Sequence, residues 1–84
     1  MIRQAQAYNK INILENEIKL SEAYMQQILN AKDRLRWEYM DIPGTDAELV
    51  GKEMNRLNKE YNKHIKRIDK NNAEISRLRR KYSI

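Results

Sequence analysis

Eighty-four residues with 40% hydrophobic and 35% charged side chains make one domain at most. No apolar run approaches the roughly 20 residues that cross a bilayer, and the N-terminus lacks a signal-peptide stretch, so we expect a cytoplasmic protein without a membrane segment. The absence of cysteine excludes disulfides and thiolate metal ligands, and a single histidine excludes a multi-histidine metal site.

The first half of the chain has apolar residues at alternating steps of three and four, which predicts a helix over residues 3–40. This seam of heptad positions comprises Ala7, Ile11, Leu14, Ile18, Ser21, Met25, Ile28, Lys32, Leu35 and Tyr39. An unbroken heptad seam is typical of a helix that supercoils against a partner helix.

A turn over residues 41–45 follows from local backbone chemistry. Pro43 disfavours helical geometry at Ile42, and Gly44 accepts a positive φ without steric cost. Thr45 and Glu48 then have the spacing of a capping box that starts the next helix. Such a short connection makes the two flanking helices antiparallel neighbours.

The second half repeats the heptad pattern and predicts a helix over residues 46–81. Its seam comprises Val50, Met54, Leu57, Tyr61, His64, Ile68, Asn71, Ile75, Leu78 and Tyr82. Pairing Tyr39 with Val50 places every seam residue of one helix opposite a seam residue of the other. The polar seam residues Ser21, Lys32, His64 and Asn71 are expected to select the register. The predicted fold is all-α, a single antiparallel two-helix coiled-coil hairpin over residues 1–84.

The first helix has more apolar residues than one partner helix can cover. An apolar flank lies beside its seam and consists of Ile13, Leu20, Tyr24 and Ala31. Such a wide apolar face predicts a second contact, for which another copy of the hairpin is the simplest candidate. We therefore expect a homodimer in the form of a four-helix bundle, with the first helices inside.

The sequence offers no catalytic constellation, no metal ligand set and no cofactor motif. The chain has one histidine and no cysteine, and its two glycines are far from any phosphate-binding pattern. His64 lies on the seam, where a register-fixing role is the simpler interpretation and a pH-sensing role the alternative. We expect a non-enzyme without a small-molecule substrate.

A basic stripe runs along the second helix, in a chain whose net charge is +5. Its candidate nucleic-acid contacts are Lys59, Lys63, Lys70, Arg77, Arg79 and Arg80. These cations could follow a phosphate backbone, or they could form an ordinary solvated face that complements the helix dipole. Aromatic residues for base stacking are missing from the stripe apart from Tyr82.

A cluster of interface-prone residues precedes the turn. It consists of Trp37 with Arg34, Arg36, Tyr39 and Met40. Trp37 lies off the seam, and tryptophan, tyrosine, arginine and methionine are enriched in protein–protein interfaces. Trp37 is therefore either a contact for another protein or a side chain that packs on the turn or on the dimer mate.

The segment MDIPGTDAELVGKEMNRL gives the chain a family resemblance. Through Met40, Pro43, Gly44, Val50 and Gly51 it resembles the helical-hairpin segment of small phage-encoded transcription activators of Gram-positive bacteria. Those activators place a sigma-like helix-turn-helix after the hairpin, whereas this sequence ends at Ile84. The resemblance implies an interaction hairpin without the DNA reader, encoded by a phage or mobile element.

Three functions remain open from the sequence. The leading prediction is an interaction protein that binds a bacterial protein or nucleoprotein, such as a polymerase or a defence nuclease, as a regulator or inhibitor. The alternative is a nucleic-acid-binding protein that uses the basic stripe. The third is an assembly or scaffolding element whose partner is itself.

Overall fold

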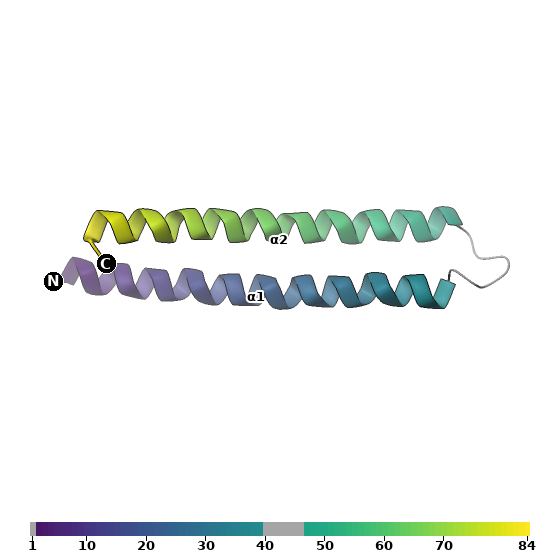
Figure 1. The fold of residues 1–84 in the computed structure, drawn as a ribbon, viewed down its shortest axis with the longest axis horizontal. Helices are drawn as coiled ribbons and strands as arrows, with labels where there is room; N and C mark the ends of the chain where they lie inside the picture. Colours follow the sequence, from purple (N-terminus) through teal and green to yellow (C-terminus); the bar gives the residue numbers. More distant parts are fainter. Residues whose placement is uncertain (1, 40–46) are drawn as a thin grey trace.

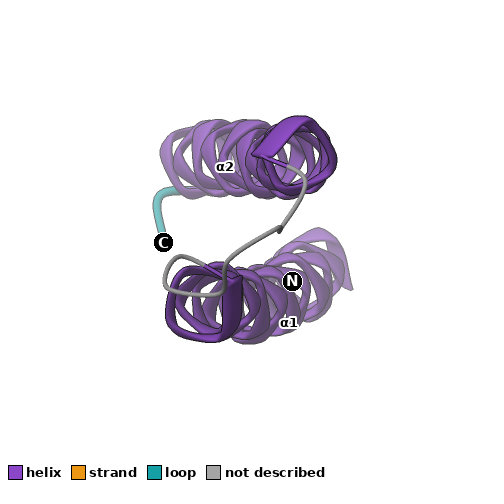
Figure 2. Cartoon of the chain, turned by 90° about the vertical axis from the view of Figure 1, so that its right-hand side faces the viewer, coloured by secondary structure: helices purple, strands orange, loops and turns teal. Residues whose placement is uncertain are grey.

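The chain folds into a helical hairpin. The computed structural model describes residues 2–39 and 47–84, with helix α1 over Ile2–Tyr39 and helix α2 over Ala47–Tyr82. The helices lie side by side and antiparallel in a rod of 66 × 15 × 12 Å (Figure 1). Viewed end on, they lean in opposite directions (Figure 2). The predicted all-α hairpin is confirmed, whereas the predicted turn chemistry, including Met40, Pro43, Gly44 and Thr45, lies outside the described residues.

The predicted seam supplies the core between the helices. The buried hydrophobic residues are Ala7, Ile11, Ile28, Leu57, Ile75 and Leu78, all at seam positions. The core is best developed at the end remote from the turn, where Ile11, Ile75 and Leu78 pack together. At the turn end Tyr39, predicted as the last seam residue of α1, is 42% exposed. Burial of the seam residues therefore varies along the hairpin and is lower towards the turn.

Two polar seam residues are buried as deeply as the apolar ones. Ser21 is fully buried, and Asn71 is buried in a network that crosses the seam. The Asn71 amide nitrogen donates to Glu17 Oε2 at 2.9 Å and to the carbonyl oxygen of Leu14 at 3.4 Å. A one-heptad slip would place Lys10 or Tyr24 where Glu17 now lies, so the buried Asn71 amide would lose its carboxylate acceptor. Asn71 therefore favours one register, as predicted for a polar seam residue.

The C-terminus of α2 closes on the core. Ser83 has a positive φ of 54°, and the Ile84 amide donates to the Arg79 carbonyl at 3.0 Å. This left-handed residue followed by a long backbone hydrogen bond is a Schellman cap. The cap returns the chain towards α1, so that Ile84 packs against the cluster of Ile11, Ile75 and Leu78 (Figure 1).

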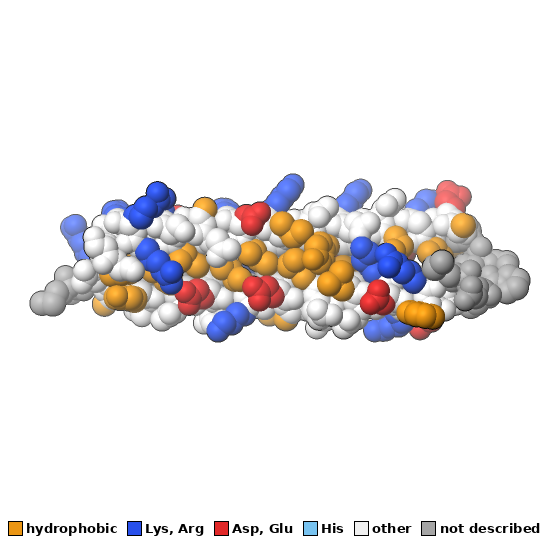
Figure 3. Space-filling model, viewed as in Figure 1, with side chains coloured by type: hydrophobic (Ala, Val, Ile, Leu, Met, Phe, Trp, Pro, Cys, Tyr) orange, Lys and Arg blue, Asp and Glu red, His pale blue; other side chains and the backbone are white. Residues whose placement is uncertain are grey.

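The outer surface differs between the two helices. Figure 3 shows one face, on which hydrophobic side chains gather along the line between the helices and charged side chains lie around them. Large hydrophobic side chains that remain exposed on α1 are Tyr8, Ile13, Leu20, Tyr24, Leu29, Trp37 and Tyr39. On α2 only Leu49 and Ile65 are exposed among the described large hydrophobics. Neither described helix combines the length and hydrophobicity that a membrane crossing requires.

Candidate interaction surfaces

Trp37 stands out from the α1 surface near the turn. Its side chain is 83% exposed, on the side of α1 opposite the seam. The preceding residues on that side at seven-residue spacing are Asn9, Asn16, Ala23 and Asn30, which are all small or polar. Trp37 is thus the one large hydrophobic residue at this heptad position within residues 9–37, and its side chain is not buried between the helices.

The other residues of the predicted Trp37 cluster have mixed placements. Arg34 and Arg36 are exposed, and no ion pair within the described residues engages them. Tyr39 is also exposed, whereas Met40 lies outside the described part of the chain. The cluster therefore combines an accessible indole, an accessible phenol and two available guanidinium groups at one end of a rod. These groups suit recognition of another macromolecule.

The predicted apolar flank of α1 is largely open to solvent. Ile13, Leu20 and Tyr24 are 59%, 50% and 45% exposed, and Ala31 is half-buried. Its four members share one side of the helix because they are spaced by seven, four and seven residues. Within one hairpin α2 therefore leaves much of this side of α1 uncovered.

Tyr24 has a contact that the seam pattern did not indicate. Its ring stacks on His64, with ring centroids 5.5 Å apart and ring planes inclined by 20°. His64 is half-buried at its seam position, and Lys63 and Arg67 line the open groove beside it. The stack fixes the inner face of the Tyr24 ring and leaves the rest of the side chain accessible. Cross-helix register, rather than spacing along one helix, determines this contact.

The six predicted basic-stripe residues divide into two groups. Arg77 pairs with Glu74 through contacts of 2.9 and 2.6 Å, and Arg79 reaches Glu15 of α1 at 3.3 Å. The other four are exposed, and no ion pair within the described residues engages them: Lys59, Lys63, Lys70 and Arg80. Four cations therefore remain available to an external anion, and two are already neutralised.

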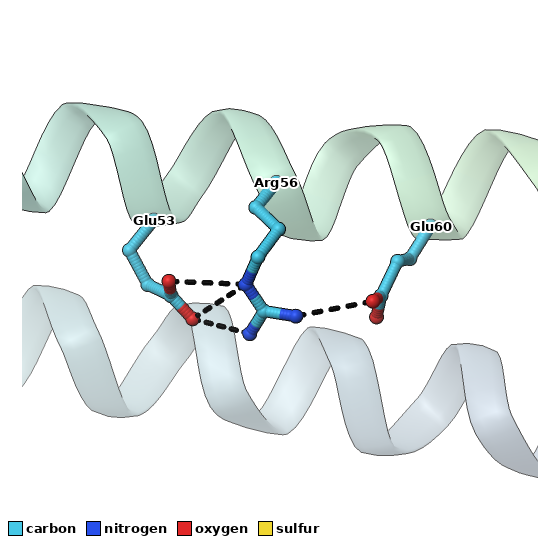
Figure 4. Close-up of polar contacts among 3 residues, drawn as sticks. All are labelled: Glu53, Arg56 and Glu60. Atoms are coloured by element: carbon cyan, nitrogen blue, oxygen red, sulfur yellow. Dashed lines mark hydrogen bonds and ion pairs between the residues drawn. The ribbon is translucent and has the colours of Figure 1, made fainter.

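Ion pairs along α2 lower the pKa of two carboxylates. The Arg77 guanidinium, with a smaller contribution from Lys10, lowers the pKa of Glu74 to about 2. Arg56 lies between Glu53 and Glu60; it pairs with Glu53 and donates to Glu60 Oε1 at 3.0 Å (Figure 4). Its hydrogen bond with Glu53 lowers the pKa of that carboxyl below the ordinary value. These pairs neutralise part of the charge beside the seam, where Glu53, Glu60 and Glu74 are half-buried.

The described residues hold no group of three or more histidine, cysteine, aspartate or glutamate side chains that could ligate a metal ion. The chemistry of the described residues is that of surfaces: an exposed indole at one end, an apolar flank on α1, and four of the six predicted stripe cations without an ion pair. No family model, curated protein or solved structure matches the chain. The resemblance to the hairpin segment of phage transcription activators therefore stays a prediction.

Proposed function

We propose that the protein is a non-enzymatic interaction protein, a stiff helical hairpin that presents the turn-side end of α1 to a macromolecular partner. The observation that carries this proposal is the 83% exposure of Trp37, at a heptad position where residues 9–30 of α1 are all small or polar. An exposed tryptophan gains more from burial at an interface than almost any other side chain. Arg34 and Arg36 precede it in sequence and supply hydrogen-bond donors that no ion pair among residues 2–39 and 47–84 engages.

The proposed partner is a bacterial protein or nucleoprotein complex. The predicted kinship with hairpin segments of phage transcription activators supports this class of partner, and a host polymerase or defence nuclease is an example. A hairpin that occupies a surface of such a machine acts as a regulator or inhibitor. Binding through a few clustered residues at one end is consistent with the concentration of interface energy in small hot spots.

Site-specific photocrosslinking tests the proposed contact. A photoreactive phenylalanine analogue replaces Trp37 in one variant and Asn16 in the control, which lies on the same side of α1. In bacterial lysate we expect position 37 to crosslink a defined protein, which mass spectrometry identifies, and position 16 to crosslink it far less. With the purified partner, Trp37→Ala should weaken binding by about 2 kcal/mol or more, as for a hot-spot residue.

The stability of the same variant separates binding from folding. Because Trp37 is exposed, Trp37→Ala should change the free energy of unfolding by no more than about 0.5 kcal/mol. Equal crosslinking at positions 37 and 16, or unchanged affinity of Trp37→Ala for the captured partner, would contradict the proposal.

Nucleic-acid binding is a second candidate, favoured by the four basic-stripe cations that form no ion pair with any described residue. Lys59, Lys63, Lys70 and Arg80 are all exposed on α2. Their substitution by glutamine should reduce both DNA or RNA affinity and the slope of log affinity against log salt, since each lost phosphate contact lowers the slope by about 0.9 for duplex DNA. Arg77→Gln serves as the control, because Glu74 already neutralises Arg77. Salt-independent binding would reject this candidate.

A further inference from the structure

A row of eight residues follows one side of α1 and includes the apolar flank. These residues, which we name the central row, are Lys10, Ile13, Glu17, Leu20, Tyr24, Gln27, Ala31 and Arg34. Steps of three and four residues keep them on one side of the helix. Most of them are exposed, and only Glu17 and Ala31 are half-buried. The central row is therefore a continuous surface beside the seam.

The central row is symmetric about the point midway between Leu20 and Tyr24. From either end the chemical classes read basic, apolar, polar, apolar, and the same four return in reverse order. The spacings three, four, three, four, three, four, three are also symmetric. A two-fold interface requires a self-complementary surface, in which each residue meets its counterpart from the partner. An antiparallel pair of central rows satisfies that requirement.

Side-chain size also suits such a pairing. A two-fold axis at the midpoint would place Ile13 opposite Ala31 of the second copy, so that a large residue meets a small one. Leu20 would meet Tyr24, and the Glu17 carboxylate would face the Gln27 amide, a potential donor. The basic residues would lie at the two ends, where solvent screens them and where Lys10 already pairs with Glu74 at 3.6 Å.

The charge inside the row is already compensated within one hairpin. Glu17 is the one charged residue between Ile13 and Ala31 in the row. Its Oε2 accepts from Asn71 at 2.9 Å and lies 3.9 Å from the Arg67 guanidinium. Burial of an unpaired carboxylate is costly, whereas a carboxylate with a hydrogen bond and a nearby cation is tolerated. The row can therefore be covered without leaving a bare charge.

We infer that the central row is the interface of a two-fold homodimer, covered by the central row of a second copy in antiparallel orientation. The two α1 helices lie inside this four-helix assembly, and the α2 helices with their charged faces lie outside. The core of a single hairpin is small, with six buried hydrophobic residues in the part of the chain that the structure describes. Small domains commonly gain the missing burial by association. The inference does not rest on the proposed partner contact at Trp37, which shares only Arg34, the last residue of the central row.

Sedimentation equilibrium tests the interface with matched variants. At tens of micromolar we expect the wild-type chain to have twice its protomer mass of 10.1 kDa. Leu20→Glu places two carboxylates near the proposed axis and should raise the dimer dissociation constant at least about 100-fold. Tyr8→Glu is the control, because Tyr8 is similarly exposed but lies outside the row. A monomeric wild-type protein, or greater loss from Tyr8→Glu than from Leu20→Glu, would overturn the inference.

Distances between spin labels test the antiparallel orientation and do not depend on a disruptive variant. The chain has no cysteine, so Asn9→Cys and Asn16→Cys each provide a single exposed site outside the row. With about 1.5 Å of rise per residue, the labels of an antiparallel dimer should be separated along the axis by about 40 Å at position 9 and about 20 Å at position 16. Equal distances at the two positions would indicate parallel helices and overturn the inference. Trp37→Ala should leave both distances unchanged, which separates this test from that of the partner contact.

Discussion

The two helices of the hairpin have similar lengths but distribute their apolar residues differently. Helix α2 directs most of them at α1, and charged residues occupy most of its remaining surface; some of these pair along the helix, such as Arg56 with Glu53 and Glu60. Helix α1 has exposed hydrophobic residues on more than one side, including Leu20 on the central row and Trp37 opposite the seam. The difference indicates that a single hairpin covers most of the apolar residues of α2, whereas α1 keeps exposed apolar residues that further partners can bury.

The largest expected effect comes from truncating a buried leucine of α2, in comparison with an exposed leucine of α1. Leu78 of α2 is buried in the cluster with Ile11 and Ile75, so Leu78→Ala should lower the free energy of unfolding by about 2–4 kcal/mol. Leu20→Ala on exposed α1 should change it by less than about 0.5 kcal/mol in dilute monomer. Urea denaturation followed by circular dichroism measures both. Equal losses of unfolding free energy in dilute solution would contradict the distinction between a buried leucine on α2 and an exposed leucine on α1.

A second experiment addresses the polar contact that joins the helices. Asn71→Ala removes the hydrogen bonds from buried Asn71 to Glu17 and to the Leu14 carbonyl, and should cost about 1–3 kcal/mol. A double-mutant cycle with Glu17→Gln measures the coupling, which we expect at about 0.5–1.5 kcal/mol. Additive losses would show that Glu17 does not support the α1–α2 register. In that case Glu17 would be less suited to burial in the central row.

The cap at the end of α2 gives a smaller effect of opposite sign. Ser83 adopts a left-handed backbone with a φ of 54°, a conformation that glycine accepts more readily. Ser83→Gly should therefore raise the free energy of unfolding by about 0.5–1 kcal/mol. Ser83→Ala, which keeps the steric cost of a Cβ atom, should give no gain. Destabilisation by Ser83→Gly would show that the Schellman cap does not close α2 in solution.

Acidification should produce the smallest effect. Arg77 lowers the pKa of Glu74 to about 2 from an ordinary value of 4.5, so the folded state favours the charged carboxylate. The resulting stabilisation is fully present above pH 4.5 and is lost as the pH falls towards 2. Because the pair is exposed, the loss is small. Urea unfolding of wild type and Glu74→Gln at pH 6 and pH 3 should converge on acidification; a constant difference would contradict the role of this pair.

Much of the fold could be predicted from periodicity alone. The heptad steps placed Ile11 and Leu57 on the seam, and both are buried. Asn71 was expected to select the register, but its acceptor Glu17 could not be identified, since that contact depends on how two helices align in space. For the same reason the pairing of Arg79 with Glu15 was not foreseen, although the pairing of Arg77 with Glu74 lies within reach of one helical turn.

The candidate surfaces were less accessible to sequence reasoning. Periodicity showed that Trp37 lies off the seam, but its solvent exposure depends on everything that packs around it. The stack of Tyr24 on His64 joins residues of different heptad positions across the hairpin. The partner of an exposed surface is a property of another molecule. Spacing within this chain therefore indicates where an exposed surface lies. Where that surface is self-complementary, the spacing also indicates one possible occupant, a second copy of the chain.

The dependence of the melting temperature on protein concentration tests most directly whether α1 is covered by a second copy. For a cooperative dimer of two 84-residue chains, a 100-fold rise in concentration should raise the melting temperature by roughly 5–10 °C. Leu20→Ala should reduce this rise, and Tyr8→Ala should preserve it. A wild-type melting temperature that stays constant from 2 to about 200 µM would contradict the pairing of α1 helices, because a folded monomer melts independently of concentration.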